Sequence, residues 1–133
     1  MNCVTDTHAL IWYLFALPEL SQKAKDFFDE VANLGGNIFV PTICIVEIIY
    51  LSEKNRLPNN VLPRVNSTIQ TTNSVVVPIN LSYAISQNLF SILRSTVSDM
   101  PDRIISATAL HLGLPLVTRD RSISQLSIIK TIW

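Results

Sequence analysis

Residues 2–12 read NCVTDTHALIW, an apolar stretch in which a short strand passes directly into a helix. We predict a strand over Asn2–Asp6 and a helix over Thr7–Ala16. The helix ends before Pro18, because a residue that precedes proline disfavours the α conformation. A strand followed at once by a helix is the repeating unit of α/β proteins.

The rest of the chain continues this alternation. Ser21 can cap a helix that Gly35-Gly36 ends, and Pro101 and Gly113 mark the two ends of another. The predicted helices are Ser21–Leu34, Thr42–Lys54, Asn60–Thr71, Ser82–Ser95 and Pro101–Leu112, and the predicted strands are Asn37–Val40, Ser74–Pro78, Leu116–Thr118 and Ile128–Ile132. The fold class is therefore α/β, with a central, mostly parallel sheet that helices cover on both faces.

The composition is that of a folded domain rather than of a disordered, collagenous or coiled-coil chain. The sequence has 133 residues, of which 48% are hydrophobic and 15% are charged. This length is typical of one domain, so we expect a single domain over residues 1–133. Ten basic and ten acidic residues give a formal net charge of zero, which excludes a global attraction to nucleic acid or membrane.

The cysteines and apolar runs indicate a soluble protein of the cytoplasm. Cys3 and Cys44 are too few for a disulfide scaffold and lie in apolar runs, so we expect buried, reduced thiols. The apolar run Ala9–Leu17 is shorter than the roughly 20 residues that span a bilayer. It follows Asp6 rather than a basic segment, so we expect no signal peptide.

Two acidic residues follow predicted strands. Asp6 ends the first strand, and Asp120 follows Leu116–Thr118. The carboxyl ends of parallel strands lie at one edge of the sheet, where ligands of α/β proteins bind. Either aspartate could instead be a helix N-cap, which accepts hydrogen bonds from free backbone amides.

Glu47 lies in an apolar helix. Its neighbours one helical turn away are Ile43, Cys44, Tyr50 and Leu51, and none of them can neutralise a carboxylate. Partial burial of an unpaired carboxylate costs on the order of several kcal/mol, so we expect an arginine, a proton or a metal ion to compensate. A buried salt bridge, or a side chain that reaches solvent, is the alternative.

Asp99 and Asp102 flank the start of the helix at Pro101. Asp102 lies in the first turn, where the helix dipole favours an anion, and Asp99 is placed to cap the helix. We therefore assign a functional role to Asp102 and a structural role to Asp99. Asp6, Glu47, Asp102 and Asp120 then form one acidic pocket.

Carboxylates that share a pocket repel one another unless a cation is present. Mg²⁺ binds oxygen ligands and keeps water and substrate phosphates in its remaining positions. Such ions activate water and stabilise a leaving oxygen. The residue types alone therefore indicate metal-assisted hydrolysis of phosphodiester bonds, without a Ser, Cys or His nucleophile.

Four motifs occur along the chain in a specific order: Val4–Trp12, Pro41-Thr42 with Glu47, Pro101–Ala109 and Leu114–Asp120. In this order they resemble the PIN-domain family, and within it the VapC-type toxins of bacterial toxin–antitoxin pairs. The resemblance covers nearly the whole chain. It implies a three-layer α/β/α PIN-like domain and an endoribonuclease whose acidic site binds Mg²⁺ or Mn²⁺.

The resemblance also implies roles for individual residues. The metal-binding acids of the family fall on Asp6, Glu47, Asp102 and Asp120, the last directly or through water, although it stays open whether Asp99 or Asp102 is the ligand. Thr7 matches a hydroxyl residue beside the first acid. Thr118 matches a hydroxyl residue two places before the last acid, where it could orient water, metal or phosphate.

The family further implies three partners: an RNA substrate, a small antitoxin protein that occupies the site, and a second copy of the chain in a homodimer. The apolar helices Thr7–Ala16 and Thr42–Lys54 could provide the protein-binding surfaces. With a net charge of zero, RNA affinity must come from metal ions and local basic groups. The arginines beside the acidic motifs could contact RNA phosphates or be plain surface charges; they are Arg103, Arg119 and Arg121.

Other candidates have less support. His8 could touch a phosphate, although a surface or packing role is preferred. Trp12, Tyr13 and Phe15 lie in an apolar helix, so we expect them in a core or an interface rather than stacked on bases.

Two other function classes remain open. A receiver-like signalling domain is also small, acidic and α/β, but it needs an acidic pair after the first strand and a lysine at the end of a late strand. Here Asp6 stands alone and Lys130 lacks that context. A non-catalytic PIN-like module that binds RNA or protein would have lost acids, whereas all four positions are acidic here.

Overall fold

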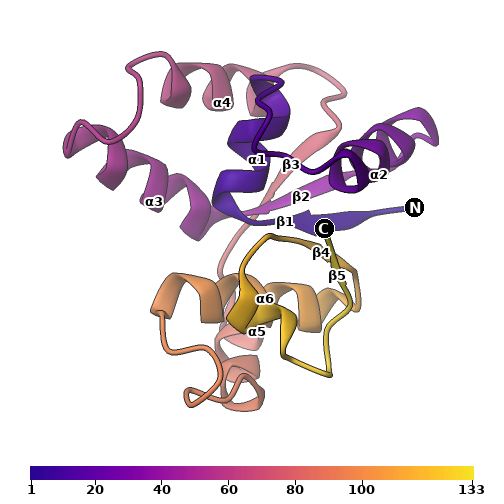
Figure 1. The fold of residues 1–133 in the computed structure, drawn as a ribbon, viewed down its shortest axis with the longest axis vertical. Coiled ribbons are helices and arrows are strands. Elements are labelled where there is room, and N and C mark those ends of the chain that lie inside the picture. Colours follow the sequence, from indigo (N-terminus) through magenta and orange to yellow (C-terminus); the bar gives the residue numbers. More distant parts are fainter.

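A five-stranded sheet, parallel throughout, forms the centre of the computed structural model, which describes residues 1–133 (Figure 1). The strand order is β3-β2-β1-β4-β5. The strands are β1 (Cys3–Thr5), β2 (Ile38–Pro41), β3 (Val76–Ile79), β4 (Leu116–Val117) and β5 (Thr131–Ile132). The first strand of the sequence is therefore central in the sheet, with β2 on one side and β4 on the other.

Helices cover both faces of this sheet. Figure 1 shows α1 to α4 on one side of the strands and α5 with α6 on the other. The helices are α1 (Thr7–Leu14), α2 (Gln22–Asn33), α3 (Thr42–Glu53), α4 (Val61–Gln70), α5 (Tyr83–Asn88), α6 (Met100–Leu112) and α7 (Arg121–Ser124), with a 3₁₀ turn η1 at Leu89–Ser91. The predicted three-layer α/β/α fold is confirmed.

Local signals set several helix ends where the sequence predicted them. The Ser21 hydroxyl accepts a hydrogen bond from the Ala24 amide and caps α2. Gly113 ends α6 in the left-handed conformation, with φ of 64°, which glycine adopts without steric cost. Ser21 and Gly113 thus define the start of α2 and the end of α6.

The predicted long helix Ser82–Ser95 is wrong. The α conformation stops at Asn88, a single 3₁₀ turn follows, and Ile92 is extended, with φ of −94° and ψ of 98°. The guanidinium of Arg103 donates hydrogen bonds to the carbonyls of Leu89 and Ile92. Because a side chain from α6 satisfies these carbonyls, the chain can leave the helix there. The short helix α7 was not predicted.

The interior is apolar and contains both cysteines. One core cluster has 19 buried residues and a second has 9, and Trp12 packs against both. Cys3 and Cys44 are buried and unpaired, as predicted. None of the helices combines the length and the apolar character that a membrane crossing requires.

Candidate active site

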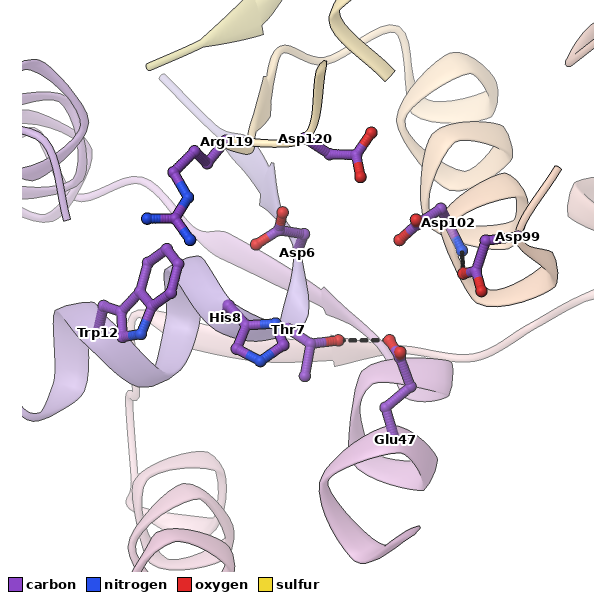
Figure 2. A pocket seen from close by; sticks show the side chains of 9 residues that line it. All are labelled: Asp6, Thr7, His8, Trp12, Glu47, Asp99, Asp102, Arg119 and Asp120. Atoms are coloured by element: carbon purple, nitrogen blue, oxygen red, sulfur yellow. Dashed lines mark hydrogen bonds between the residues drawn. The ribbon is translucent and has the colours of Figure 1, made fainter. Parts of the chain in front are cut away.

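An acidic pocket of about 470 Å³ lies at the carboxyl ends of β1 and β4 (Figure 2). Five carboxylates line it, together with one hydroxyl, one imidazole, one guanidinium and one aromatic side chain. These residues are Asp6, Glu47, Asp99, Asp102, Asp120, Thr7, His8, Arg119 and Trp12. The structure thus brings together the four acids that the sequence singled out, and adds Asp99 to them.

Asp6 is both a helix cap and a member of the pocket. It follows β1, and its Oδ1 accepts a hydrogen bond of 2.8 Å from the Ala9 amide at the start of α1. Its Oδ2 accepts a second bond, of 2.5 Å, from the hydroxyl of Thr118. The capping and functional interpretations of Asp6 are therefore compatible, because the two carboxylate oxygens have different partners.

Asp120 is arranged in a similar way at the start of α7. Its Oδ1 accepts hydrogen bonds from the Ile123 amide at 2.9 Å and from the Ser122 hydroxyl at 2.7 Å. Its backbone amide donates to the Thr118 hydroxyl oxygen at 3.0 Å. The cap fixes one oxygen of Asp120, and the carboxylate remains on the pocket wall.

Thr118 is buried and does not line the pocket itself. Its hydroxyl donates to Asp6 and accepts from the amide of Asp120. One hydroxyl thus ties the end of β1 to the segment that follows β4. Thr118 acts on the site by orienting Asp6, whereas its predicted contact with water, metal or phosphate would require that hydroxyl to change partners.

Glu47 is half-buried on α3, as its apolar neighbours predicted. Its Oε1 accepts a hydrogen bond of 2.6 Å from the hydroxyl of Thr7 (Figure 2). The partner is distant in sequence, as expected, but it is a neutral hydroxyl rather than an arginine. The one ion pair of the structure joins Lys25 and Asp29, outside the pocket.

Asp99 and Asp102 come from the start of α6. The Asp99 Oδ2 accepts a hydrogen bond of 3.1 Å from the amide of Asp102, so Asp99 caps the helix as predicted. Asp99 nevertheless also lines the pocket. Figure 2 shows both side chains on the α6 wall, across the pocket from Arg119.

A known protein family matches nearly the whole chain. The family model described as the PIN domain matches residues 3–129. The chain belongs to the PIN domain family. No curated protein sequence is significantly similar to this PIN domain.

Solved structures share the fold of this PIN domain over nearly its whole length. VapBC2 from Rickettsia felis, bound to a promoter DNA fragment, matches with a TM-score of 0.72 and 13% identity, covering 98% of this chain and 97% of that chain. A toxin–antitoxin complex from Klebsiella pneumoniae matches with a TM-score of 0.63 and 21% identity, covering 96% and 94%. FitAcB from Neisseria gonorrhoeae matches with a TM-score of 0.64 and 15% identity, covering 98% and 96%.

The charges of the PIN-domain pocket are unbalanced. Burial, together with the charges of the four other pocket carboxylates, raises the pKa of Asp102 to about 7. Burial also raises the pKa of Asp6 and of Glu47, and the hydroxyls of Thr118 and Thr7 partly oppose that rise by hydrogen bonding. The carboxylates therefore repel one another without a cation to compensate them.

The chemistry of these groups fits a hard divalent cation. All the acidic donors are oxygen atoms, which Mg²⁺ and Mn²⁺ prefer, and the pocket has an excess of negative charge. No three acidic, histidine or cysteine side chains converge closely enough to hold an ion in the arrangement observed. Asp6 and Glu47 instead point toward hydroxyl partners, so ion binding requires the carboxylates to move closer together.

The three candidate arginines of the PIN domain have different surroundings. The guanidinium of Arg103 donates hydrogen bonds to the carbonyls of Leu89 and Ile92, so the role of Arg103 is structural. Arg121 is exposed at the start of α7 and does not line the pocket. Arg119 does line it, with its guanidinium carbon 4.5 Å from the centroid of the Trp12 ring.

The sequence analysis did not predict that Trp12 would line the pocket beside Arg119. Trp12 was expected only in a core or an interface, yet it also lines the pocket, and exposed His8 lies beside it with ring centroids 5.5 Å apart. The available signal was helical spacing, because His8 and Trp12 are four residues apart and share one face of α1.

Proposed function

We propose that this PIN domain is a metal-dependent endoribonuclease and the toxin of a toxin–antitoxin pair. The observation that carries the proposal is the assembly of Asp6, Glu47, Asp102 and Asp120, from four separate elements, around one pocket without a paired cation. The toxin assignment is supported by the fold shared with solved structures described as VapBC2 and as a toxin–antitoxin complex.

In this proposal Asp6, Glu47 and Asp102 would hold Mg²⁺ or Mn²⁺, and Asp120 would contribute directly or through water. When bound, such an ion would supply an activated water and would neutralise charge on the scissile phosphate. The protein provides orientation, since Thr118 holds Asp6 and Thr7 holds Glu47. The caps at the starts of α1, α6 and α7 fix the backbone that carries the aspartates.

The thiols are poor candidates for a nucleophile. Cys44 is completely buried, and its burial raises the thiol pKa far above the ordinary value. Only the thiolate is strongly nucleophilic, so Cys44 has neither the access nor the charge that attack requires. Attack by water is the mechanism that the pocket supports.

Mapping of RNA ends tests this function. The purified protein is incubated with total cellular RNA in Mg²⁺ or in EDTA, beside the variants Asp6→Asn and Asp26→Asn. Asp26 is exposed on α2 and serves as an acid outside the pocket. We expect new ends at a few sites with wild type and Asp26→Asn in Mg²⁺, and none with EDTA or Asp6→Asn. Equal cleavage by Asp6→Asn and wild type would contradict the proposal.

A non-catalytic RNA- or protein-binding module is the alternative. It is disfavoured because all four acids are present and lie together. If no new ends appear, titration with Mn²⁺ distinguishes the two functions, because a module without a working site need not bind the ion. The receiver-like interpretation is set aside, because the chain is a PIN domain.

The proposed partners are RNA, a small antitoxin protein and a second copy of the chain, all in the cytoplasm. The helix α3 carries Glu47 and also exposes Val46, Ile49 and Tyr50, with Tyr50 61% exposed. An apolar surface next to an acidic site suits a protein partner that covers the site.

A further inference from the structure

The pocket has two chemically different sides. Figure 2 shows Glu47, Asp99 and Asp102 on one side and Arg119 with Trp12 on the other, with Asp6 between them. Of all the lysine and arginine residues, Arg119 alone lines the pocket. A polyanion that approaches the carboxylates would therefore meet a single fixed positive charge at this wall.

The Trp12 ring holds this guanidinium. The Arg119 guanidinium carbon lies 4.5 Å from the ring centroid, within the range of a cation–π interaction. Trp12 is itself fixed, because it packs against both core clusters and meets the ring of Trp133 edge-on at 5.9 Å. Arg119 thus has a defined position although it is exposed.

Arg119 forms no ion pair with any of the carboxylates that share its pocket. A guanidinium that lies against a ring still has N–H groups that can donate hydrogen bonds within its own plane. These donors have the fork geometry that binds two phosphate oxygens at once. Because Arg119 forms no ion pair, its contact with Trp12 leaves N–H donors that can bind phosphate oxygens.

From this arrangement we infer that Arg119 binds a phosphate of the RNA strand next to the phosphate that is cleaved, and that Trp12 positions Arg119 for this contact. The inference rests on the proposed ribonuclease function. With the scissile phosphate over Asp6 and Asp102, a strand that continues across the pocket past Asp6 would bring a neighbouring phosphate to Arg119. Arg103 and Arg121 do not take this role, since one is bonded to backbone and the other lies outside the pocket.

Single-turnover cleavage tests the inference. The probe is a labelled single-stranded RNA oligonucleotide that contains a cleavage site mapped in total RNA, incubated in Mg²⁺ at several salt concentrations. The variants are Arg119→Ala, Arg119→Lys and Trp12→Phe, and Arg121→Ala is the matched control. Thermal unfolding of each variant shows whether it is folded; Arg119 is exposed, so its substitution leaves the core intact.

For Arg119→Ala we expect the protein concentration at half-maximal rate to rise about tenfold, and the slope of log affinity against log salt to fall by about 0.7, the value for one phosphate contact on a single strand. The maximal rate should change less than about threefold, because a flanking contact stabilises the bound substrate and the transition state alike. Arg119→Lys should keep the salt slope but lose part of the affinity, since lysine lacks the planar fork. Trp12→Phe keeps a ring below Arg119 and should resemble wild type.

Equal effects of Arg119→Ala and Arg121→Ala would overturn the inference and leave the ribonuclease function in place. A fall in maximal rate without a change in half-maximal concentration would also overturn it. If wild type cleaves no RNA at any metal concentration, the proposed function fails and the assignment of Arg119 fails with it.

Discussion

Thr118 shows how much of the site depends on a single hydroxyl group. It joins the carboxylate of Asp6 to the backbone of Asp120, two residues that belong to different strand ends. It has no solvent-exposed surface, so water cannot replace the hydrogen bonds that it makes. Thr118 thus helps the Ala9 amide to position Asp6, although Thr118 does not line the pocket itself.

Replacing Thr118 by valine should therefore lower RNA cleavage and stability together. The loss of a buried partner costs about 1–3 kcal/mol, and the Asp6 pKa should rise further because its hydrogen-bond donor is gone. Urea unfolding and cleavage in Mg²⁺ measure the two effects, and Thr118→Ser should restore both. The control is Thr108→Val, since the buried hydroxyl of Thr108 bonds only to its own helix, at the Ile104 carbonyl. Cleavage at the wild-type rate by Thr118→Val would contradict this role.

Mutation should distinguish the structural role of Asp99 from the functional role of Asp102. Asn caps helices about as well as Asp, so Asp99→Asn keeps the start of α6 and removes only a charge. We expect cleavage within about threefold of wild type for Asp99→Asn, and a loss of at least about 100-fold for Asp102→Asn. Initial cleavage rates at saturating Mg²⁺ are the measurement. The reverse order of the two losses would assign the metal to Asp99 instead.

Asp102 should also make stability depend on pH when no metal is present. The pKa of Asp102 is about 7 in the folded protein, whereas the ordinary value for an aspartic acid side chain is 3.8. The folded state therefore binds this proton more tightly than the unfolded state does. The contribution of Asp102 to the free energy of unfolding is therefore largest below about pH 4, and it falls as the pH rises toward 7. Because solvent screens the partly exposed side chain, we expect a loss of about 1–2 kcal/mol rather than the full value of the shift.

Urea unfolding in EDTA at pH 5 and pH 8 measures this effect. The free energy of unfolding of wild type should fall between pH 5 and pH 8, and that of Asp102→Asn should fall clearly less. An equal loss in both proteins would show that Asp102 is not the responsible group. Added Mg²⁺ should raise the stability of wild type at pH 8, because a ligand that binds the folded state stabilises it.

At the scale of the elements, several helix starts and one helix end were predictable because their signals are local. Ser21, Asp99 and Gly113 act within a few residues of the helix ends that they define. The end of α5 was not predictable, since it depends on Arg103, which is 14 residues beyond Leu89. Short elements also escape such reasoning: α7 has only 4 residues, too few for a periodic pattern.

Arg103 should accordingly be a structural residue rather than an RNA contact. Its removal leaves the carbonyls of Leu89 and Ile92 without their charged donor, which costs about 1.5–3 kcal/mol. Arg103→Ala should lower the midpoint of urea unfolding, and RNA affinity should not fall once the folded fraction is taken into account. The exposed Arg94 provides the control, and Arg94→Ala should leave the midpoint unchanged. An intact midpoint with weakened RNA binding in Arg103→Ala would reverse this assignment.

At the scale of the whole molecule, the exposed apolar side chains are the main unexplained feature. Besides those on α3, they include Tyr83, Phe90, Leu93 and Met100, and Phe90 is 83% exposed. Monomeric proteins rarely expose large contiguous apolar patches, although single exposed residues are common. These side chains lie on several elements, and a homodimer, which stays a prediction, would cover those on α3.

Light scattering at high protein concentration should therefore give the mass of two chains. Tyr50→Glu places a charge on the exposed face of α3 and should shift the equilibrium toward single chains without unfolding them. Glu30→Lys on α2 changes an exposed residue in a hydrophilic helix and should leave the mass unchanged. A single-chain mass for wild type at every concentration would contradict the prediction.

The acids of the site could be predicted from sequence, whereas their partners could not. Asp6 and Asp120 were recognisable because they follow strands, and parallel strand ends share one edge. The hydroxyl of Thr7 on Glu47 and the ring of Trp12 below Arg119 depend on how α1 packs against other segments. Such pairs carry no local pattern, because either residue would suit many other environments.

The central position of β1 also governs when in folding the site can appear. The bond between Thr118 and Asp6 spans 112 positions of the chain, and β1 gains its second neighbour only when β4 docks. Contacts of such long sequence separation close slowly, since a large loop must be ordered first. A nascent or partly folded chain that lacks this docking has Asp6 without its orienting hydroxyl and without Asp120. Under the proposed ribonuclease function, the site that cuts RNA would therefore be complete only near the end of folding.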